Sequence, residues 1–251
     1  MFRDLIPRLQ QHFHLIAPDY PGFGYSDAPA PESYSYTFDH LAETIDQLLS
    51  HIGARTYLLY LQDYGGPIGM RLATAHPDRI KGLIIQNANA YREGLSPEWR
   101  AELEQRAREA ADHPGPTPPK HKRPSALETN LQWTQHMYTQ GAHDSMTMTP
   151  DGYTFDAAML SRPGQDDIQD ILGDDYYTNM LLYSTWQQWL KKHQPRTLIV
   201  WGRGDYIFGP AAAEAYRRDL PQAKLVFYPG GHFVLEEYAP EIAQEIVAMF
   251  R

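Results

Sequence analysis

The sequence contains no cysteine, which excludes disulfide bridges and thiolate chemistry. It also lacks any apolar run close to the ~20 residues that a membrane-spanning helix needs, so no membrane partner is expected. The chain starts Met1-Phe2-Arg3-Asp4 and has no apolar signal-peptide core. These absences together predict a cytoplasmic protein.

Positive charge is scarce as well. The 22 Lys and Arg residues face 31 Asp and Glu residues, which gives a net charge of −9, and the basic residues form no stripe. Nucleic acid is therefore not an expected partner. No HExxH or similar ligand spacing occurs, and Gly22 and Gly24 are followed by Asp27 instead of the third glycine of a dinucleotide loop. We therefore expect neither a metal nor a cofactor.

The 251 residues are 42% hydrophobic, enough for one compact unit with an inserted subdomain. Short apolar runs predict buried strands at 14–18, 56–62, 80–86, 197–201 and 224–228. Helical spacing of apolar residues runs through the first dozen residues and predicts further helices at 38–52, 65–76, 210–219 and 239–250. This alternation indicates an α/β fold, with a mainly parallel sheet and helices on both faces.

Residues 90–193 break the alternation. They contain a charged helix at 98–111, a proline-rich stretch at 113–124 and many aromatic residues. We interpret this segment as an inserted helical cap. Residues 1–89 and 194–251 then form the core.

The strongest local pattern is Gln62-Asp63-Tyr64-Gly65-Gly66, where a predicted strand runs into a helix with almost no loop. This layout is typical of a nucleophile elbow, with Asp63 in place of the usual serine. An aspartate that only caps a helix is the alternative. Asp205 and His232 each follow a later strand. Singly they could be turn or surface residues, but the order nucleophile, acid, histidine predicts a catalytic triad.

The segment Asp19-Tyr-Pro-Gly-Phe-Gly-Tyr-Ser-Asp27 resembles the D-x-x-G-x-G-x-S-D segment of epoxide hydrolases and haloalkane dehalogenases. The segment around Asp63 resembles their nucleophile segment, and the likeness extends over nearly the whole chain outside the cap. The resemblance implies an α/β-hydrolase fold and a small, apolar, electrophilic substrate.

A carboxylate nucleophile suits attack on a saturated carbon, and the product is an alkyl ester of Asp63. His232 is then expected to activate the water that hydrolyses the ester, and Asp205 to hold the imidazole in place. The Tyr64 N–H is the expected oxyanion donor.

The leaving group separates the two enzyme classes. Dehalogenases resemble each other in placing a tryptophan after the nucleophile, where Tyr64 stands here, which counts against halide chemistry. The segment from Asn179 to Tyr183, with Trp189 six residues on, resembles the second cap-tyrosine segment of epoxide hydrolases and implies that Tyr183 is an acid. The second cap tyrosine, which would act together with Tyr183, is not identified by the sequence. The candidates are Tyr138, Tyr153, Tyr176 and Tyr177, and each tyrosine could simply pack the cap.

An epoxide hydrolase-like enzyme is therefore favoured. The alternatives are a haloalkane dehalogenase-like hydrolase, an esterase relative in which Asp63 has replaced serine and abolished acyl transfer, and a catalytically impaired protein. The last follows from a further resemblance. In this family three strands precede the helix that here starts at Met1, and the third ends in an HG-x-P loop that this sequence lacks. We therefore expect an N-terminal truncation that removes a central strand and the second oxyanion donor.

Overall fold

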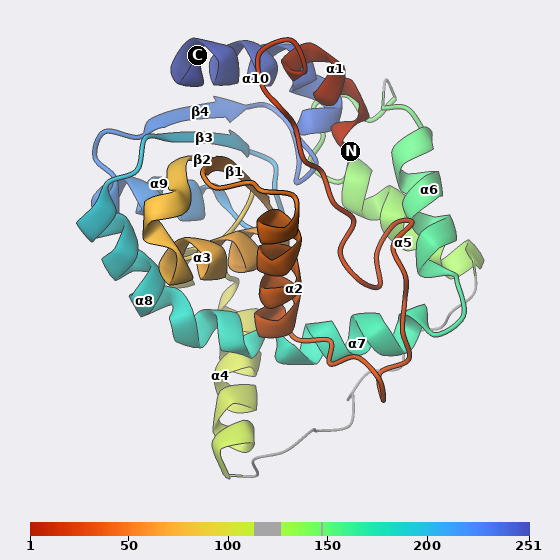
Figure 1. Cartoon of the computed structure of the whole chain (residues 1–251). Coiled ribbons are helices and arrows are strands. Elements are labelled where there is room, and N and C mark those ends of the chain that lie inside the picture. The colour runs from red at the N-terminus through yellow and green to blue at the C-terminus, as the bar shows by residue number, and fades with distance from the viewer. Residues whose placement is uncertain (113–126, 147) are drawn as a thin grey trace.

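The computed structural model describes residues 1–112, 127–146 and 148–251, and within them four strands form one sheet (Figure 1). The strands are β1 (Tyr57–Gln62), β2 (Ile80–Gln86), β3 (Thr197–Gly202) and β4 (Lys224–Tyr228). They lie in sequence order, and every neighbouring pair is parallel. The parallel sheet that the sequence predicts is confirmed.

Helices cover both faces of the sheet (Figure 1). One face carries α2 (Phe38–His51), α3 (Gly65–Ala75), α8 (Tyr177–His193) and α9 (Pro210–Asp219). The other carries the short η1 (Phe2–Asp4), α1 (Ile6–Leu9) and the long α10 (Leu235–Phe250). Side chains alternate between the two cores along β3, with Ile199 and Trp201 on the first face and Leu198 and Val200 on the second.

Local sequence explains where the long helices begin. Thr37 caps α2, because its side chain accepts a hydrogen bond from the His40 N–H. The last helix was predicted from residue 239 but begins at Leu235. It is kinked at Tyr238, two residues before Pro240, which has no N–H to continue a regular helix.

Between β2 and β3 the described chain is helical. The turn η2 (Pro77–Arg79) still precedes β2. After β2 come the turn η3 (Arg92–Gly94) and the helices α4 (Pro97–Asp112), α5 (Leu127–Thr139), α6 (Asp151–Leu160), α7 (Gln165–Asp175) and α8. Because α8 packs on α3 and α9, the insertion is joined closely to the sheet. The division into core and cap at residues 90 and 193 stays a prediction. The proline-rich stretch lies outside the described residues.

The strand predicted at 14–18 is wrong. This run has no regular structure, and Ile16 is 39% exposed. A strand exists only where a neighbour supplies a hydrogen-bonded ladder, and β1 is an edge of the described sheet that does not pair with this run. Leu15 contributes a half-buried side chain to the core under α10 instead.

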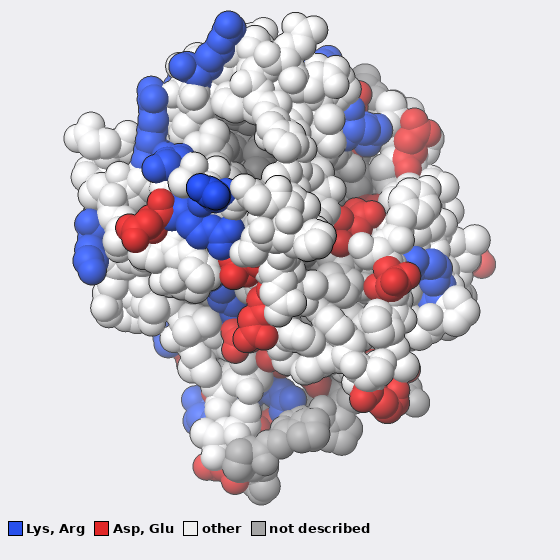
Figure 2. Space-filling model, viewed as in Figure 1, with Lys and Arg blue, Asp and Glu red and all other residues white. Residues whose placement is uncertain are grey.

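Charge is not segregated on the surface seen in Figure 2, where Lys and Arg side chains stand among Asp and Glu side chains. In the part of the chain that the structure describes, no helix is both long enough and apolar enough to cross a membrane.

Candidate active site

Asp63 lies in the sharp turn between β1 and α3. Its φ of 43° is in the left-handed region, which non-glycine residues rarely adopt. Its N–H donates to the Asn87 carbonyl at 3.3 Å, and its own carbonyl accepts from the Gly66 N–H at 2.9 Å. A Cβ at Gly66 would lie 2.9 Å from the Cβ of Ala88, so α3 can follow the turn this closely only with glycine there. The half-buried Asp63 carboxyl is thereby held at the carboxyl-terminal edge of the sheet.

Asp205 and His232 come to the same edge, because the strands are parallel and both residues follow strand ends. His232 Nδ1 lies 3.0 Å from Asp205 Oδ2, and His232 Nε2 lies 3.8 Å from Asp63 Oδ1. The His232 side chain is completely buried. The structure therefore brings together the three residues that the sequence singled out, in the order carboxylate, imidazole, carboxylate.

Asp205 is held on all sides. Its Oδ1 accepts the backbone N–H groups of Ile207 and Phe208 at 2.8 and 3.1 Å, and its Oδ2 accepts Asn87 Nδ2 at 2.7 Å. Asn87 also accepts the Gly202 N–H at 3.2 Å and has a φ of 44°. Sequence reasoning missed Asn87, although a polar residue directly after the apolar strand β2 was a usable signal.

The surroundings shift the proton affinities of the site. Burial raises the pKa of Asp63 above its ordinary value, against the lowering effect of the His232 charge and of a hydrogen bond from the Tyr64 backbone. Burial acts to lower the pKa of His232, but the Asp205 carboxylate, its hydrogen bond and the Asp63 charge outweigh burial, so that this pKa is raised. The positively charged imidazole is thus stabilised from both sides.

Two neighbours of Asp63 complete this edge of the sheet. The Tyr64 N–H, the expected oxyanion donor, is directed at the Asp63 carboxylate. Gln62 Nε2 lies 3.2 Å from His232 Nε2. This contact fits a neutral imidazole that donates from Nδ1 to Asp205 and accepts at Nε2.

Tyr183 is buried, and its hydroxyl accepts Asn89 Nδ2 at 3.1 Å and is hydrogen bonded to Tyr176. Burial is the main cause that raises the pKa of Tyr176, and the Tyr183 and Asp63 charges add to it. The Tyr176 ring lies 6.0 Å from the ring of Tyr64, the residue after Asp63. Of the four open partner candidates, Tyr176 is therefore the one that meets Tyr183.

The other three candidates have different partners. The Tyr138 hydroxyl donates to Asp156 at 2.6 Å, the Tyr153 ring packs on Tyr138, and Arg106 lies over the Tyr177 ring. Tyr206, which sequence reasoning missed, directly follows Asp205 and is half exposed. Its pKa is raised by burial first, and then by the charges of Asp205 and Asp63.

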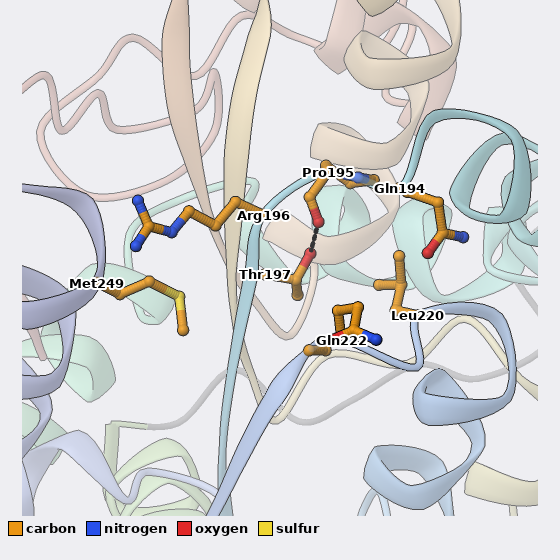
Figure 3. Close-up of a pocket in the computed structure, with 8 residues that line it drawn as sticks. Gln194, Pro195, Arg196, Thr197, Leu220, Gln222 and Met249 are labelled. Carbon is orange, nitrogen blue, oxygen red and sulfur yellow. Dashed lines mark hydrogen bonds between the residues drawn. The ribbon is translucent and has the colours of Figure 1, made fainter.

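A pocket lies at the opposite edge of the sheet (Figure 3). Its lining includes Arg196 and Thr197 at the start of β3, Ala223 just before β4, and Met249 of α10. It is thus a full strand length from Asp63. Among the described residues, no group of three or more His, Asp or Glu side chains is placed to hold a metal ion.

A family model for the alpha/beta hydrolase fold matches residues 1–239. The chain is an α/β-hydrolase. This α/β-hydrolase is 40% identical over 254 residues to an uncharacterized hydrolase of Saccharomyces cerevisiae, covering 100% of this chain and 84% of the yeast protein. It is 39% identical over 87 residues to haloalkane dehalogenase 2 of Mycobacterium tuberculosis, which covers 35% of this chain and 30% of the dehalogenase.

A solved structure of a meta-cleavage product hydrolase from Pseudomonas fluorescens IP01 superposes on the α/β-hydrolase with a TM-score of 0.74. It covers 99% of this chain and 84% of that chain at 18% identity, and so bears on the fold alone. The predictions of an α/β-hydrolase fold and of a hydrolytic enzyme are confirmed.

Proposed function

We propose that Asp63 is the nucleophile of this hydrolase and forms an alkyl ester with its substrate. The observation that carries the proposal is the position of Asp63 in a left-handed turn, with the imidazole of His232 3.8 Å from its carboxylate. A carboxylate needs no base before it attacks a saturated carbon. The raised pKa of Asp63 accompanies partial loss of solvation, which makes a carboxylate more reactive.

In the second step, His232 Nε2 takes a proton from water, and the hydroxide attacks the ester carbonyl carbon of Asp63. The ester C–O bond on the acyl side breaks, and the alcohol leaves with the proton from His232. The new carboxyl group of Asp63 then gives up its own proton, which restores the carboxylate and replaces the proton that an epoxide oxygen takes in the first step. Asp205 fixes the tautomer and stabilises the imidazolium. The Tyr64 N–H is the donor for the oxygen that becomes negative in this step.

The leaving group favours an epoxide. When Asp63 attacks an epoxide carbon, the ring C–O bond breaks and the oxygen must gain a proton. The hydrogen-bonded Tyr176 and Tyr183 pair supplies it, because a tyrosine hydroxyl carries its proton at neutral pH. A halide leaves without a proton, so this pair has no task in dehalogenation. The second candidate, haloalkane dehalogenation, is favoured by the segment 39% identical to haloalkane dehalogenase 2.

The test uses His232→Gln, which is expected to form the ester but not to hydrolyse it. The variant is incubated with small epoxides and with haloalkanes, and intact mass and peptide mapping locate any adduct. We expect a stable mass increase of one whole epoxide on Asp63, and none in Asp63→Asn. Adducts from haloalkanes with release of halide would select the second candidate. If neither substrate class labels the variant while the wild type turns it over, the two-step mechanism is wrong.

A further inference from the structure

Arg71 is a buried arginine that joins three helices. It lies in α3, the helix that follows Asp63, and its Nε donates to Asp39 of α2 at 2.5 Å. Its Nη1 donates to Asn179 Oδ1 at 2.6 Å and its Nη2 to Thr178 Oγ1 at 3.1 Å, both on α8. The guanidinium therefore holds two core helices and one cap helix with its planar set of donors.

The turn of α8 that Arg71 holds is the one that carries the tyrosines. Tyr176 immediately precedes Tyr177, the first residue of α8, and its carbonyl accepts the Asn179 N–H at 3.0 Å. Tyr183 lies four residues after Asn179 and thus on the same face of the helix. Any shift of Thr178 and Asn179 must move both phenols.

The surroundings of the guanidinium leave it little freedom. It lies 5.6 Å from the ring centroids of both Phe38 and Trp186. Asp175, the last residue of α7, accepts the Phe38 N–H at 2.8 Å and thereby ties the start of α8 to α2 a second time. The first turn of α8 is consequently fixed to the helices of the core and not only to the rest of the cap.

We propose that Arg71 is a positioning residue, which sets the distance between the Tyr176–Tyr183 hydroxyl pair and Asp63. The inference rests on the function proposed above and adds a residue that does not touch the reacting atoms. The connection from Asp63 to Arg71 runs through the single helix α3, and two hydrogen bonds lead from Arg71 to Thr178 and Asn179. Misplacement of reacting groups by about 1 Å can cost ~10²-fold in rate, so this link governs epoxide opening.

The test compares Arg71→Met with a matched control, Arg79→Met. Arg79 is also anchored to α2, where it donates to Asp46 at 2.6 Å, and it donates to the Ala54 carbonyl at 2.8 Å, so that these partners lie in the core. In single turnovers with an epoxide, we expect Arg71→Met to slow ester formation by roughly 10- to 10²-fold and to leave ester hydrolysis unchanged. Arg79→Met should lower thermal stability but leave both rates unchanged.

A double variant separates positioning from general damage. If Arg71 acts through the tyrosines, Arg71→Met should have little further effect on ester formation in a Tyr176→Phe background. Arg71→Lys, which keeps the charge but not the fork, should recover part of the rate. An equal loss in both steps, or a full loss that persists without the Tyr176 hydroxyl, would overturn the proposal.

A crystal structure of Arg71→Met makes the result independent of turnover. We expect Tyr176 and Tyr183 to be displaced relative to Asp63, and unmoved phenols would overturn the positioning role whatever the kinetics. A wild-type enzyme that never forms an ester on Asp63 would refute the proposed function instead. The displacement seen in the crystal structure would then decide the role of Arg71 by itself.

Discussion

At the scale of single residues, the site depends on an imidazole enclosed between two carboxylates. Burial favours neutral His232, yet Asp205 and Asp63 together raise the pKa of His232 above its ordinary value of 6.5. Only the neutral imidazole can take a proton from water. In the ester proposed above Asp63 carries no charge, so that Asp205 and its hydrogen bond alone oppose the effect of burial on the His232 pKa.

This predicts how the rates depend on pH. Ester hydrolysis should rise with pH as His232 loses its proton, because only the neutral imidazole is a base. In Asp205→Asn the midpoint should fall, because burial then meets less opposition, while the rate at high pH also drops as the tautomer is lost. Rapid quenching followed by intact mass measures the ester at each pH. A midpoint that does not respond to the loss of Asp205 would contradict this account of His232.

At the scale of elements, Asp175, the last residue of α7, links that helix to the start of α2. Burial, which outweighs the Phe38 N–H and the charge of Arg71, raises its pKa from 3.8 to about 6. The charge of Asp39 acts in the same direction as burial. Since the folded state holds this proton more tightly than the unfolded chain, Asp175 makes stability fall as pH rises from 3.8 to about 6.

The consequence is testable with Asp175→Asn. As pH is raised through this window, the wild type should lose stability relative to the variant, and the difference should stay constant above it. Urea unfolding at a series of pH values measures the two curves. Asp167→Asn, which removes an exposed carboxylate from the same helix, controls for the change in net charge. Parallel curves for wild type and Asp175→Asn would show that Asp175 does not titrate in this window.

The sequence predicts elements well where one segment determines its own burial. The runs at 56–62, 80–86 and 197–201 are apolar because both faces of the sheet are covered, and they match β1, β2 and β3 within one residue. The run at 14–18 is also short and largely apolar, but a strand needs in addition a paired neighbour, which local sequence does not reveal. The error has this physical cause.

The candidate site also contains residues that the sequence predicts and contacts that it does not. Asp63, Asp205 and His232 could be placed together from sequence, because the ends of parallel strands meet at one edge. The pairing of Tyr183 with Tyr176, and the contact of Asn87 with Asp205, depend on how segments far apart in the chain pack. No periodicity in the sequence encodes these contacts.

At the scale of the whole molecule, the insertion and the core meet at glycines. Gly141, in the loop after α5, has a φ of 76°, and a Cβ there would overlap the backbone of Gly204. Gly204 immediately precedes Asp205. A Cβ at Gly231, which immediately precedes His232, would lie 2.5 Å from the Gln140 carbonyl oxygen of the same loop. The loop after α5 thus touches the loops that carry Asp205 and His232 backbone to backbone.

Gly141→Ala should therefore lower the free energy of unfolding substantially. A left-handed alanine alone costs roughly 1–2 kcal/mol, and here the new methyl group must also push the loop away from Gly204. Gly164→Ala is the control, because Gly164 has a φ of 81° but open space around its Cα. Urea unfolding should show a larger loss for Gly141→Ala, together with reduced turnover. An equal loss of unfolding free energy in the two variants would mean that the loop after α5 moves away from Gly204 at no measurable cost.

The parallel ladder between β2 and β3 bears on how such enzymes diversify. Leu83 to Gln86 pair with Thr197 to Val200, so the sheet fixes both ends of the intervening segment and is insensitive to its length. Natural selection can exchange most of that segment as one contiguous piece of gene. Such an exchange would alter which substrates bind, while the site residues at the ends of the strands are inherited unchanged. The start of α8 is the exception, because its hydrogen bonds to Arg71 tie that turn to α3. Recombination that breaks after α7 would preserve this match, and recombination that replaces α8 would have to rebuild it.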